Sequence, residues 1–321
     1  MSRIVRFWLA VAALAAGCGL AGAASIDLGR IFDIGKDVAD ATKGMDEKDE
    51  IAIGREISGR MLGAAPLVAD PELQAYVNRV GRWVASQSER PDLPWHFGII
   101  DTASINAFAA PGGYVLITRG LYEILDGEAQ LAGVLGHEIG HVVRRHHITV
   151  MQKSAAISAG ARIAQGNRNQ IINNLIGSGA EVMARGLDKS AEFESDQIGV
   201  VLAARAGYSP YGLVEVLHKL SARAGDDASL ALLFKTHPHP GERLTELGSA
   251  LTPRMATLPS GKEPPIRQVA ADVPPPAATS APAAAGTRAL TSDEVAPTVK
   301  GGGKGGIGID PGSVLRGIFG R

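Results

Sequence analysis

The sequence predicts a mixed α+β domain that is mostly helical, with a small β-hairpin beside a long central helix. Helical periodicity with recognisable caps recurs through residues 46–255, whereas strand-like patterns are confined to residues 95–118. After Arg254 the composition changes to proline, alanine and glycine, with few large apolar residues. At 321 residues the chain is long enough for one sizeable domain with accessory segments.

The first 24 residues have the pattern of an export signal. Two arginines precede an apolar run over residues 7–16, which is shorter than the ~20 residues that cross a bilayer, and small residues follow it. Two cleavage positions fit: before Cys18, as in bacterial lipoprotein signals, or after the Ala-x-Ala of residues 21–23. In the first case Cys18 is lipidated and anchors the protein to the outer membrane. In the second it is discarded with the signal peptide. Both cases predict export to the periplasm.

Two helices are expected to begin the domain. After a short amphipathic lead-in over residues 25–45, a helix begins near Asp46 in DEKDEIAIGREISGRML. Asp70 and Pro71 open the next helix, with aspartate as the N-cap and proline at the first helical position. We therefore predict that the folded domain runs from residue 46 to residue 255.

Three strand-like segments follow. Residues 95–100 (WHFGII), 104–109 (SINAFA) and 114–118 (YVLIT) are rich in apolar and β-branched side chains. The last two are separated by Ala110 and the turn Pro111-Gly112-Gly113. This arrangement predicts a β-hairpin.

Helices are expected to make up the rest of the domain. One covers residues 127–147 with Asp126 as its cap, one covers residues 181–206 and is closed by Gly207, and one starts at Ser209-Pro210 and runs to about residue 222. Residues 256–321 are rich in proline, alanine and glycine, which predicts a mostly disordered tail.

The charge balance points to no particular polyanion. Lysine and arginine number 32 against 33 acidic residues, so no overall field attracts nucleic acid, and no nucleic-acid partner is expected. Any charge that matters for function is local.

The segment GVLGHEIGHVVRRHH contains an HExxH motif on an apolar helix. His137 and His141 are four residues apart, so both imidazoles share one face and can bind one metal ion. Glu138 is rotated by ~100°, which places its carboxylate beside the metal and within reach of a bound water. The alternative is a pair of satisfied core histidines. A metal is favoured because buried imidazoles and a carboxylate without partners would cost several kcal/mol.

The third ligand is less clear from spacing. His147 has the spacing of the longer HExxHxxGxxH motif, but Arg144 stands where that motif has glycine, and on a continuous helix His147 would lie too far away. With His146 it is expected to end the helix. A second helix offers carboxylates at Asp188, Glu192, Glu194 and Asp196. Glu192 and Asp196 share a face, whereas apolar periodicity would bury Glu194, so the choice stays open, as does a simple solvated face.

The motifs LGHEIGH, EFESDQIG and THPHPGER, together with INAFAAPGGYVLITRGL, resemble the M48 family of zinc metallopeptidases from about residue 46 to residue 251. The resemblance implies a zincin-like metallopeptidase domain, with the small β-sheet beside the HExxH helix and one zinc ion per chain. It also implies Glu192 as the third ligand and Asp196 as its partner residue in the second shell of contacts. In that family the HP-x-x-x-x-R pattern lies near the cleft, which here places His237 and Arg243 there.

Two further hypotheses concern the cleft. His237 could occupy the open zinc position when substrate is absent, and Arg243 could steady the oxyanion or a helix terminus; a merely rigid loop is the alternative. The edge of the predicted hairpin, with Asn106 and Ala107 nearest by analogy, could bind an extended substrate through main-chain hydrogen bonds. A plain core hairpin is the alternative.

The predicted function is that of an exported zinc endopeptidase in which Glu138 is the general base for a zinc-activated water. Its expected substrates are polypeptides, unfolded or envelope proteins in particular. A zinc-stabilised chaperone or assembly factor for outer-membrane proteins is the alternative, and a structural lipoprotein with an incidental zinc is a weaker one.

Overall fold

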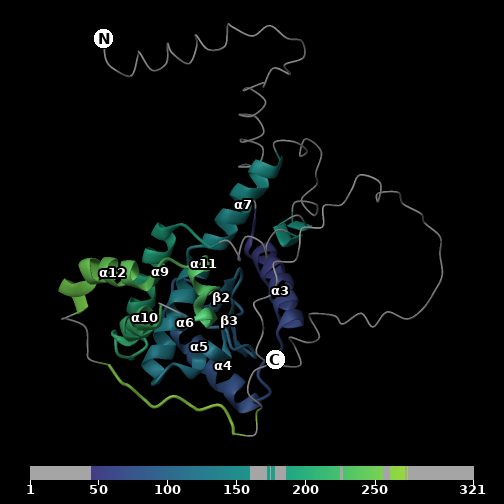
Figure 1. Cartoon of the computed structure of the whole chain (residues 1–321). Coiled ribbons are helices and arrows are strands. Elements are labelled where there is room, and N and C mark those ends of the chain that lie inside the picture. The colour runs from purple at the N-terminus through teal and green to yellow at the C-terminus, as the bar shows by residue number, and fades with distance from the viewer. Residues whose placement is uncertain are drawn as a thin grey trace, which may run out of the picture.

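The computed structural model describes residues 45–159, 172–173, 175–177, 186–224, 227–255, 261–271 and 273. The predicted signal peptide, nearly all of the lead-in segment and the end of the tail lie outside these residues. The elements are α3 (Glu47–Ala64), α4 (Pro71–Ala85), β1 (His96–Ile100), β2 (Ala107–Ala110), β3 (Tyr114–Thr118), α5 (Arg119–Glu123), α6 (Glu128–Val143), α7 (His146–Ala159), α9 (Lys189–Arg205), α10 (Gly212–Arg223), α11 (Leu233–Thr236) and α12 (Pro240–Met255), with a 3-10 turn at Ala228–Leu230. The predicted mostly helical α+β architecture is confirmed (Figure 1).

The first two helices begin where the sequence predicts, and each has an aspartate as its N-cap. The Asp46 carboxylate accepts a hydrogen bond from the Asp49 N–H at 3.0 Å, and that of Asp70 accepts one from the Leu73 N–H at 2.9 Å. Each bond satisfies a donor that the first helical turn leaves free. Pro71 fits the first position of α4 because it has no N–H to satisfy.

The sheet has three strands in the order β1-β3-β2. β2 and β3 form the predicted antiparallel hairpin, whose turn uses Gly112 (φ 73°) and Gly113 (φ 99°) in the left-handed region. β1 pairs with β3 in parallel. β2 begins at Ala107, later than predicted, because the N–H of Ile105 donates to the Ser229 carbonyl outside the sheet. Because the strand order places β2 beside β3 alone, β2 is an edge strand.

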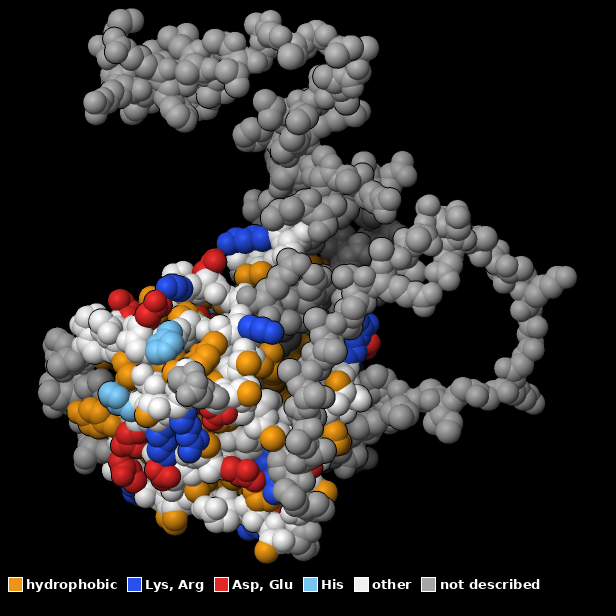
Figure 2. Space-filling view, viewed as in Figure 1, with side chains coloured by type: hydrophobic (Ala, Val, Ile, Leu, Met, Phe, Trp, Pro, Cys, Tyr) orange, Lys and Arg blue, Asp and Glu red, His pale blue; other side chains and the backbone are white. Residues whose placement is uncertain are grey.

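Helices on both sides enclose this sheet. α4 packs against β1, and α6 packs against β2 and against α4, α9 and α10. In Figure 1, α3 lies on one side of the sheet and the group of α9, α10 and α12 on the other. The main hydrophobic core lies between the sheet, α4 and α6, and includes Phe97, Ile117 and Leu135, which are all fully buried. On the face drawn in Figure 2, acidic and basic side chains lie next to one another.

The prediction of one continuous helix over residues 127–147 is wrong. α6 has Gly127 as its N-cap, while Asp126 pairs with Lys219, and the helix ends at Val143. The chain turns at Arg145, whose φ of 56° is left-handed, and α7 starts at His146. The break is stabilised by the ion pair between Arg145 and the buried Glu50, at 3.0 Å.

The later helices differ from the predictions mainly in their bounds. α9 is described from Lys189, and residues 181–185 of the predicted helix lie outside the described residues. Gly207 follows α9 with a φ of 90°, as a C-terminal glycine should. α10 begins at Gly212 rather than directly after Pro210. The sequence reading did not predict α12.

A short stretch of the predicted tail packs onto the domain. The Pro264 carbonyl accepts a hydrogen bond from the Glu128 N–H at the start of α6, the Lys262 N–H donates to the Gly207 carbonyl, and Ile266 is buried. The packed part of the chain therefore extends beyond residue 255 to include residues 261–271. Among the described residues, no helix combines the length and apolar character needed to cross a bilayer.

Candidate metal centre

Helices α6 and α9 meet almost backbone to backbone because both have glycine at the crossing. A Cβ at Gly136 would lie 2.8 Å from the Gly199 carbonyl oxygen, and one at Gly199 would lie 2.7 Å from the His137 nitrogen. No larger residue fits at these separations. The close approach brings the N-terminal half of α9 against the HExxH motif of α6.

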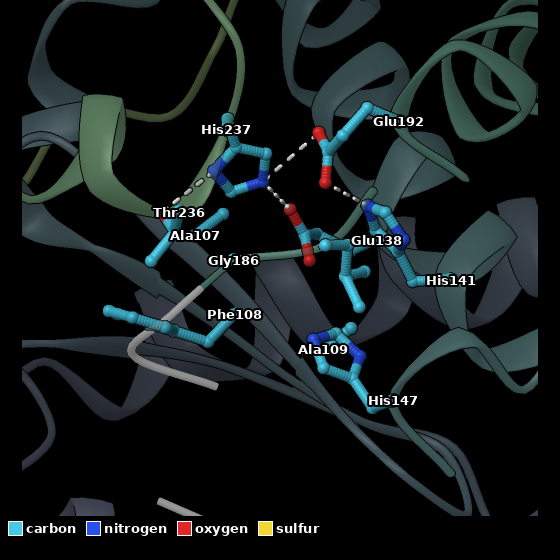
Figure 3. Close-up of a pocket in the computed structure, with 11 residues that line it drawn as sticks. Ala107, Phe108, Ala109, Glu138, His141, His147, Gly186, Glu192, Thr236 and His237 are labelled. Atoms are coloured by element: carbon cyan, nitrogen blue, oxygen red, sulfur yellow. Dashed lines mark hydrogen bonds and ion pairs between the residues drawn. The ribbon is translucent and has the colours of Figure 1, made fainter. Parts of the chain in front are cut away.

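Three ligand-type side chains converge at this crossing. The Nε2 atoms of His137 and His141 are 3.1 Å apart, and they lie 3.6 and 3.5 Å from the two carboxylate oxygens of Glu192. All three side chains are at most 3 % exposed. His237 from the loop after α11 adds a fourth donor, and the four ligand atoms lie within 4.8 Å of one another. Figure 3 shows three of these residues, His141, Glu192 and His237.

The donor set fits a zinc ion. Tetrahedral zinc with bonds near ~2.0–2.1 Å separates its ligand atoms by roughly 3.3 Å, which is close to the separations found here. Among the described residues, Glu192 Oε2 has no hydrogen-bond partner although it is buried. A buried carboxylate oxygen without a donor is costly, and a cation would satisfy it.

A carboxylate and a guanidinium orient His137 from behind. His137 Nδ1 lies 2.8 Å from Asp196 Oδ1, and Arg243 Nε donates to Asp196 Oδ2 at 2.9 Å. All three groups are buried. Burial would raise the pKa of Asp196, but Arg243 and His137 outweigh it and hold that pKa below its usual range. The ionised Asp196 therefore fixes the Nδ1–H tautomer, which leaves Nε2 of His137 facing the cluster.

His141 has a different set of supporting groups, which the sequence reading missed. Its Nδ1 lies 3.1 Å from both Ser195 Oγ and His146 Nδ1, and His146 Nε2 lies 3.3 Å from Glu194 Oε2. The expectation that Glu194 is buried is wrong, because its side chain is 47 % exposed and pairs with Arg144. The face of α9 that meets α6 is set by its small residues, not by its aliphatic stripe.

Glu138 lies beside the four donors and is not one of them. It is 3 % exposed, and its Oε1 lies 4.0 Å from His237 Nε2. Burial raises the pKa of Glu138 to about 8, against the opposing effect of Arg243. Burial likewise raises the pKa of Glu192. Burial lowers the pKa of His137 and His141, so the site consists of neutral imidazoles and of carboxyl groups that need a nearby positive charge to ionise.

His237 and His147 both reach this region, from different segments. Thr236 Oγ1 lies 2.9 Å from His237 Nδ1, which leaves its Nε2 directed at the cluster, 3.8 Å from Glu192 Oε2. His147 is not one of the four clustered donors, as expected, but the stated reason was wrong: α6 does not continue to residue 147. Burial lowers the pKa of His147 to about 4.

A small cavity of about 20 Å³ lies in front of the cluster. It is lined by Ala107, Phe108, Ala109, Glu138, His141, His147, Gly186, Leu187, Glu192, Thr236 and His237 (Figure 3). The edge strand β2 thus forms one wall of the cavity, opposite the metal-binding face of α6.

The hydrogen bonds of β2 decide which of its groups face this cavity edge. The Asn106 carbonyl accepts from the Thr118 N–H, and the Asn106 N–H donates to Thr118 Oγ1, so the main chain of Asn106 is already used. In an antiparallel pair the direction of the main-chain groups alternates, so those of Ala107 and Ala109 point away from β3. The Ala107 N–H is taken by the Asn106 side chain at 2.9 Å. The main chain of Asn106 is therefore used within the sheet, whereas that of Ala109 points away from β3.

Comparison with known proteins gives a consistent result. The model of peptidase family M48 matches residues 71–251. The beta-barrel assembly-enhancing protease of Yersinia pestis is 30% identical over 224 residues, which cover 67% of this chain and 46% of that protein. Its namesake from Escherichia coli K12 is 29% identical over 243 residues, 70% of this chain and 50% of that protein. The mitochondrial metalloendopeptidase OMA1 of Schizosaccharomyces pombe is 28% identical over 175 residues, 54% of this chain and 51% of that protein. The chain spans about half the length of these relatives.

Proposed function

Since this chain belongs to peptidase family M48, whose members are zinc metallopeptidases, we propose that it is a zinc-dependent endopeptidase. The observation that carries the proposal is the convergence of His137, His141 and Glu192 on one buried point, with an unsatisfied carboxylate oxygen. Glu138 stands next to that point without belonging to the donor set. This separates metal ligands from a base, as hydrolysis by an activated water requires.

In the proposed mechanism His137, His141 and Glu192 would hold the zinc. Bound zinc supplies a Lewis acid that acidifies water and polarises the scissile carbonyl. Glu138 accepts a proton from the attacking water and returns it to the departing amine. Its burial keeps competing water away, and its raised pKa means that it becomes an effective base only with a cation nearby. Asp196, which Arg243 holds in place, keeps His137 in the tautomer that binds through Nε2.

His237 is proposed to gate the site. Its Nε2 is directed at the same point as the three ligands, and Thr236 holds its other nitrogen. In this position the imidazole would occupy the coordination place that substrate and water need. Catalysis then requires the loop between α11 and α12 to move His237 away.

The edge strand β2 is proposed to bind an extended substrate peptide through main-chain hydrogen bonds. The carbonyl of Ala107 and both main-chain groups of Ala109 point away from β3 and can pair with an extended peptide, which would place one of its peptide bonds between β2 and Glu138. Recognition through main-chain bonds favours unfolded segments and tolerates many side chains.

Export to the periplasm is proposed from the N-terminal arginines and apolar run, with lipid anchoring through Cys18 as the finer possibility. The substrates proposed are unfolded or envelope proteins. Two of the relatives have names that link them to β-barrel assembly, which supports this class. The catalytic domain proposed is residues 46–255 together with the packed segment 261–271.

The test uses the full-length protein and its Glu138→Gln variant. Both should contain zinc, and only the wild type should cleave casein, with cleavage abolished by a chelator and restored by added zinc. His141→Ala, in contrast, should lose both zinc and cleavage. Cleavage of casein by Glu138→Gln at the wild-type rate would refute the proposed role of Glu138 as the base of a zinc endopeptidase. Full function in cells without cleavage would indicate an assembly role instead.

A further inference from the structure

The turn after α6 returns a third histidine of the motif region to the cavity. Because Arg145 is left-handed, α7 starts beside the end of α6, and His147 lies in its first turn. The ring of His147 has its centroid 5.6 Å from that of His141, and it lines the same cavity as Glu138 and residues 107–109 (Figure 3). The side chain is partly buried.

His147 differs from the other histidines at the site because it has no hydrogen-bond partner among the described residues. Asp196 contacts His137, Ser195 contacts His141, and Thr236 contacts His237. Within the described part of the chain, no hydrogen bond or ion pair is formed by the His147 imidazole, and its nitrogens are not among the clustered donor atoms. A partly buried imidazole has both a donor and an acceptor to satisfy, so its position facing the cavity suits a bound ligand.

The position of His147 along β2 can be derived from the two cavities around Glu138. The cavity that His147 lines includes Ala109, whereas a second cavity, which reaches Leu213 and Leu217, includes Ala107 but not Ala109. His147 therefore lies toward the Ala109 end of the strand. Ile148, the next residue, packs with Ala110 in one hydrophobic cluster, which agrees with this placement.

We propose that His147 binds the main chain of the peptide substrate at the Ala109 end of the cavity. The inference rests on the proposed function and adds a substrate-binding residue to it. A peptide paired with β2 along one edge still has N–H and C=O groups on its other edge, and these need partners once water is excluded. His147 lines the same cavity as β2 and forms no hydrogen bond with the described residues, so its imidazole can supply one such partner. It is a substrate-binding residue and not a metal ligand.

The first test compares His147→Ala and His147→Gln with the exposed-histidine control His218→Ala, all in the full-length protein. A fluorogenic peptide taken from a casein cleavage site serves as substrate. His147→Ala should lower kcat/KM by about 2- to 12-fold, the factor expected for one hydrogen bond, and His147→Gln should recover part of the loss. Bound zinc should stay at the wild-type amount. An unchanged kcat/KM with both variants overturns the proposal, and so does a loss of zinc, which would make His147 a ligand.

A second test identifies the bond itself. Replacing single amides of the peptide by esters removes one N–H at a time. An ester removes one N–H and also makes the adjoining carbonyl a weaker acceptor. For the ester that removes or weakens the group bound by His147, next to the scissile bond, His147→Ala should no longer lower kcat/KM. A penalty that stays the same for every ester contradicts a main-chain contact.

Peptide binding separates this inference from the proposed function. If the wild type hydrolyses no peptide, the proposed function fails. The zinc-loaded Glu138→Gln protein then serves to measure the Kd of the same peptide with and without His147→Ala. A weaker Kd in the double variant supports the inference, and equal values overturn it.

Discussion

Substitution of Gly199 by alanine should damage both the fold and the metal centre. The new Cβ would lie 2.7 Å from the His137 nitrogen, about 0.7 Å short of the 3.4 Å at which ordinary contact begins. Both groups are helix backbone, so α9 must move away from α6. Overpacking of this kind typically costs ~1–3 kcal/mol, against a gain of at most ~1 kcal/mol in helix propensity. With the full propensity gain, the net loss is up to about 2 kcal/mol.

The same displacement should weaken zinc binding. Metal–ligand distances tolerate shifts of only ~0.2 Å, and Glu192 lies on α9 two turns before Gly199, so the zinc Kd should rise about tenfold or more. Urea unfolding of the metal-free protein measures the first effect, and zinc titration against a competing chelator measures the second. Gly248→Ala in α12 is the matched control, because a Cβ at this position meets nothing within 4 Å. This substitution should raise the free energy of unfolding slightly. Wild-type stability together with wild-type zinc affinity in Gly199→Ala would refute the close-approach argument.

Three further predictions follow from buried charges and from the packed tail segment. Arg243→Ala leaves the buried carboxylate of Asp196 without its ion-pair partner and should lower the free energy of unfolding by about 3–5 kcal/mol. An unchanged urea midpoint would contradict this. In the metal-free folded protein Glu138 has a pKa of about 8, whereas in the unfolded chain it loses its proton near pH 4.5. The free energy of unfolding relative to that of Glu138→Gln should therefore fall by several kcal/mol between pH 4.5 and pH 8. Urea unfolding at both pH values measures this difference, and an equal difference at the two would argue against the raised pKa. Truncation after residue 260 removes the buried Ile266 and should lower stability by about 1–3 kcal/mol relative to truncation after residue 273, and equal melting temperatures would show that the segment contributes nothing.

The sequence predicts the local features of this fold well where short-range chemistry decides them. The helix start near Asp46, the cap at Asp70 and the glycine turn of the hairpin depend on residues within four positions of one another, and the structure has all three. The end of α6 could not be predicted in the same way. Its break depends on the ion pair of Arg145 with Glu50, which lies 95 residues earlier in the chain.

The site was predictable to the extent that spacing on one helix fixes geometry. His137, Glu138 and His141 belong to one helical motif, so their relative positions follow from the helix itself. The choice between Glu192 and Glu194 did not follow, because apolar periodicity suggested burying the wrong one. The contact of Gly199 with the backbone of His137 sets the facing side of α9, and a pattern based on hydrophobicity does not register glycine as a contact residue.

The contacts around the metal ligands were partly accessible to sequence reasoning. Asp196 was expected because it shares a face with Glu192, and the structure places it against His137. Ser195 and His146 were missed as supports of His141 because they come from two segments that meet only after the chain turns at Arg145. His146 directly follows the left-handed Arg145, so its position beside His141 depends on a turn that the sequence pattern does not predict.

The most direct test of the whole account is the metal content of purified full-length protein and of its Glu192→Ala variant, measured by elemental analysis after dialysis against a weak chelator. We expect one zinc ion per wild-type chain and a loss of most of it in Glu192→Ala, with both proteins still folded. Wild-type protein without tightly bound metal, or a Glu192→Ala variant that retains a full zinc ion, would contradict the proposed convergence of α6 and α9 on one metal.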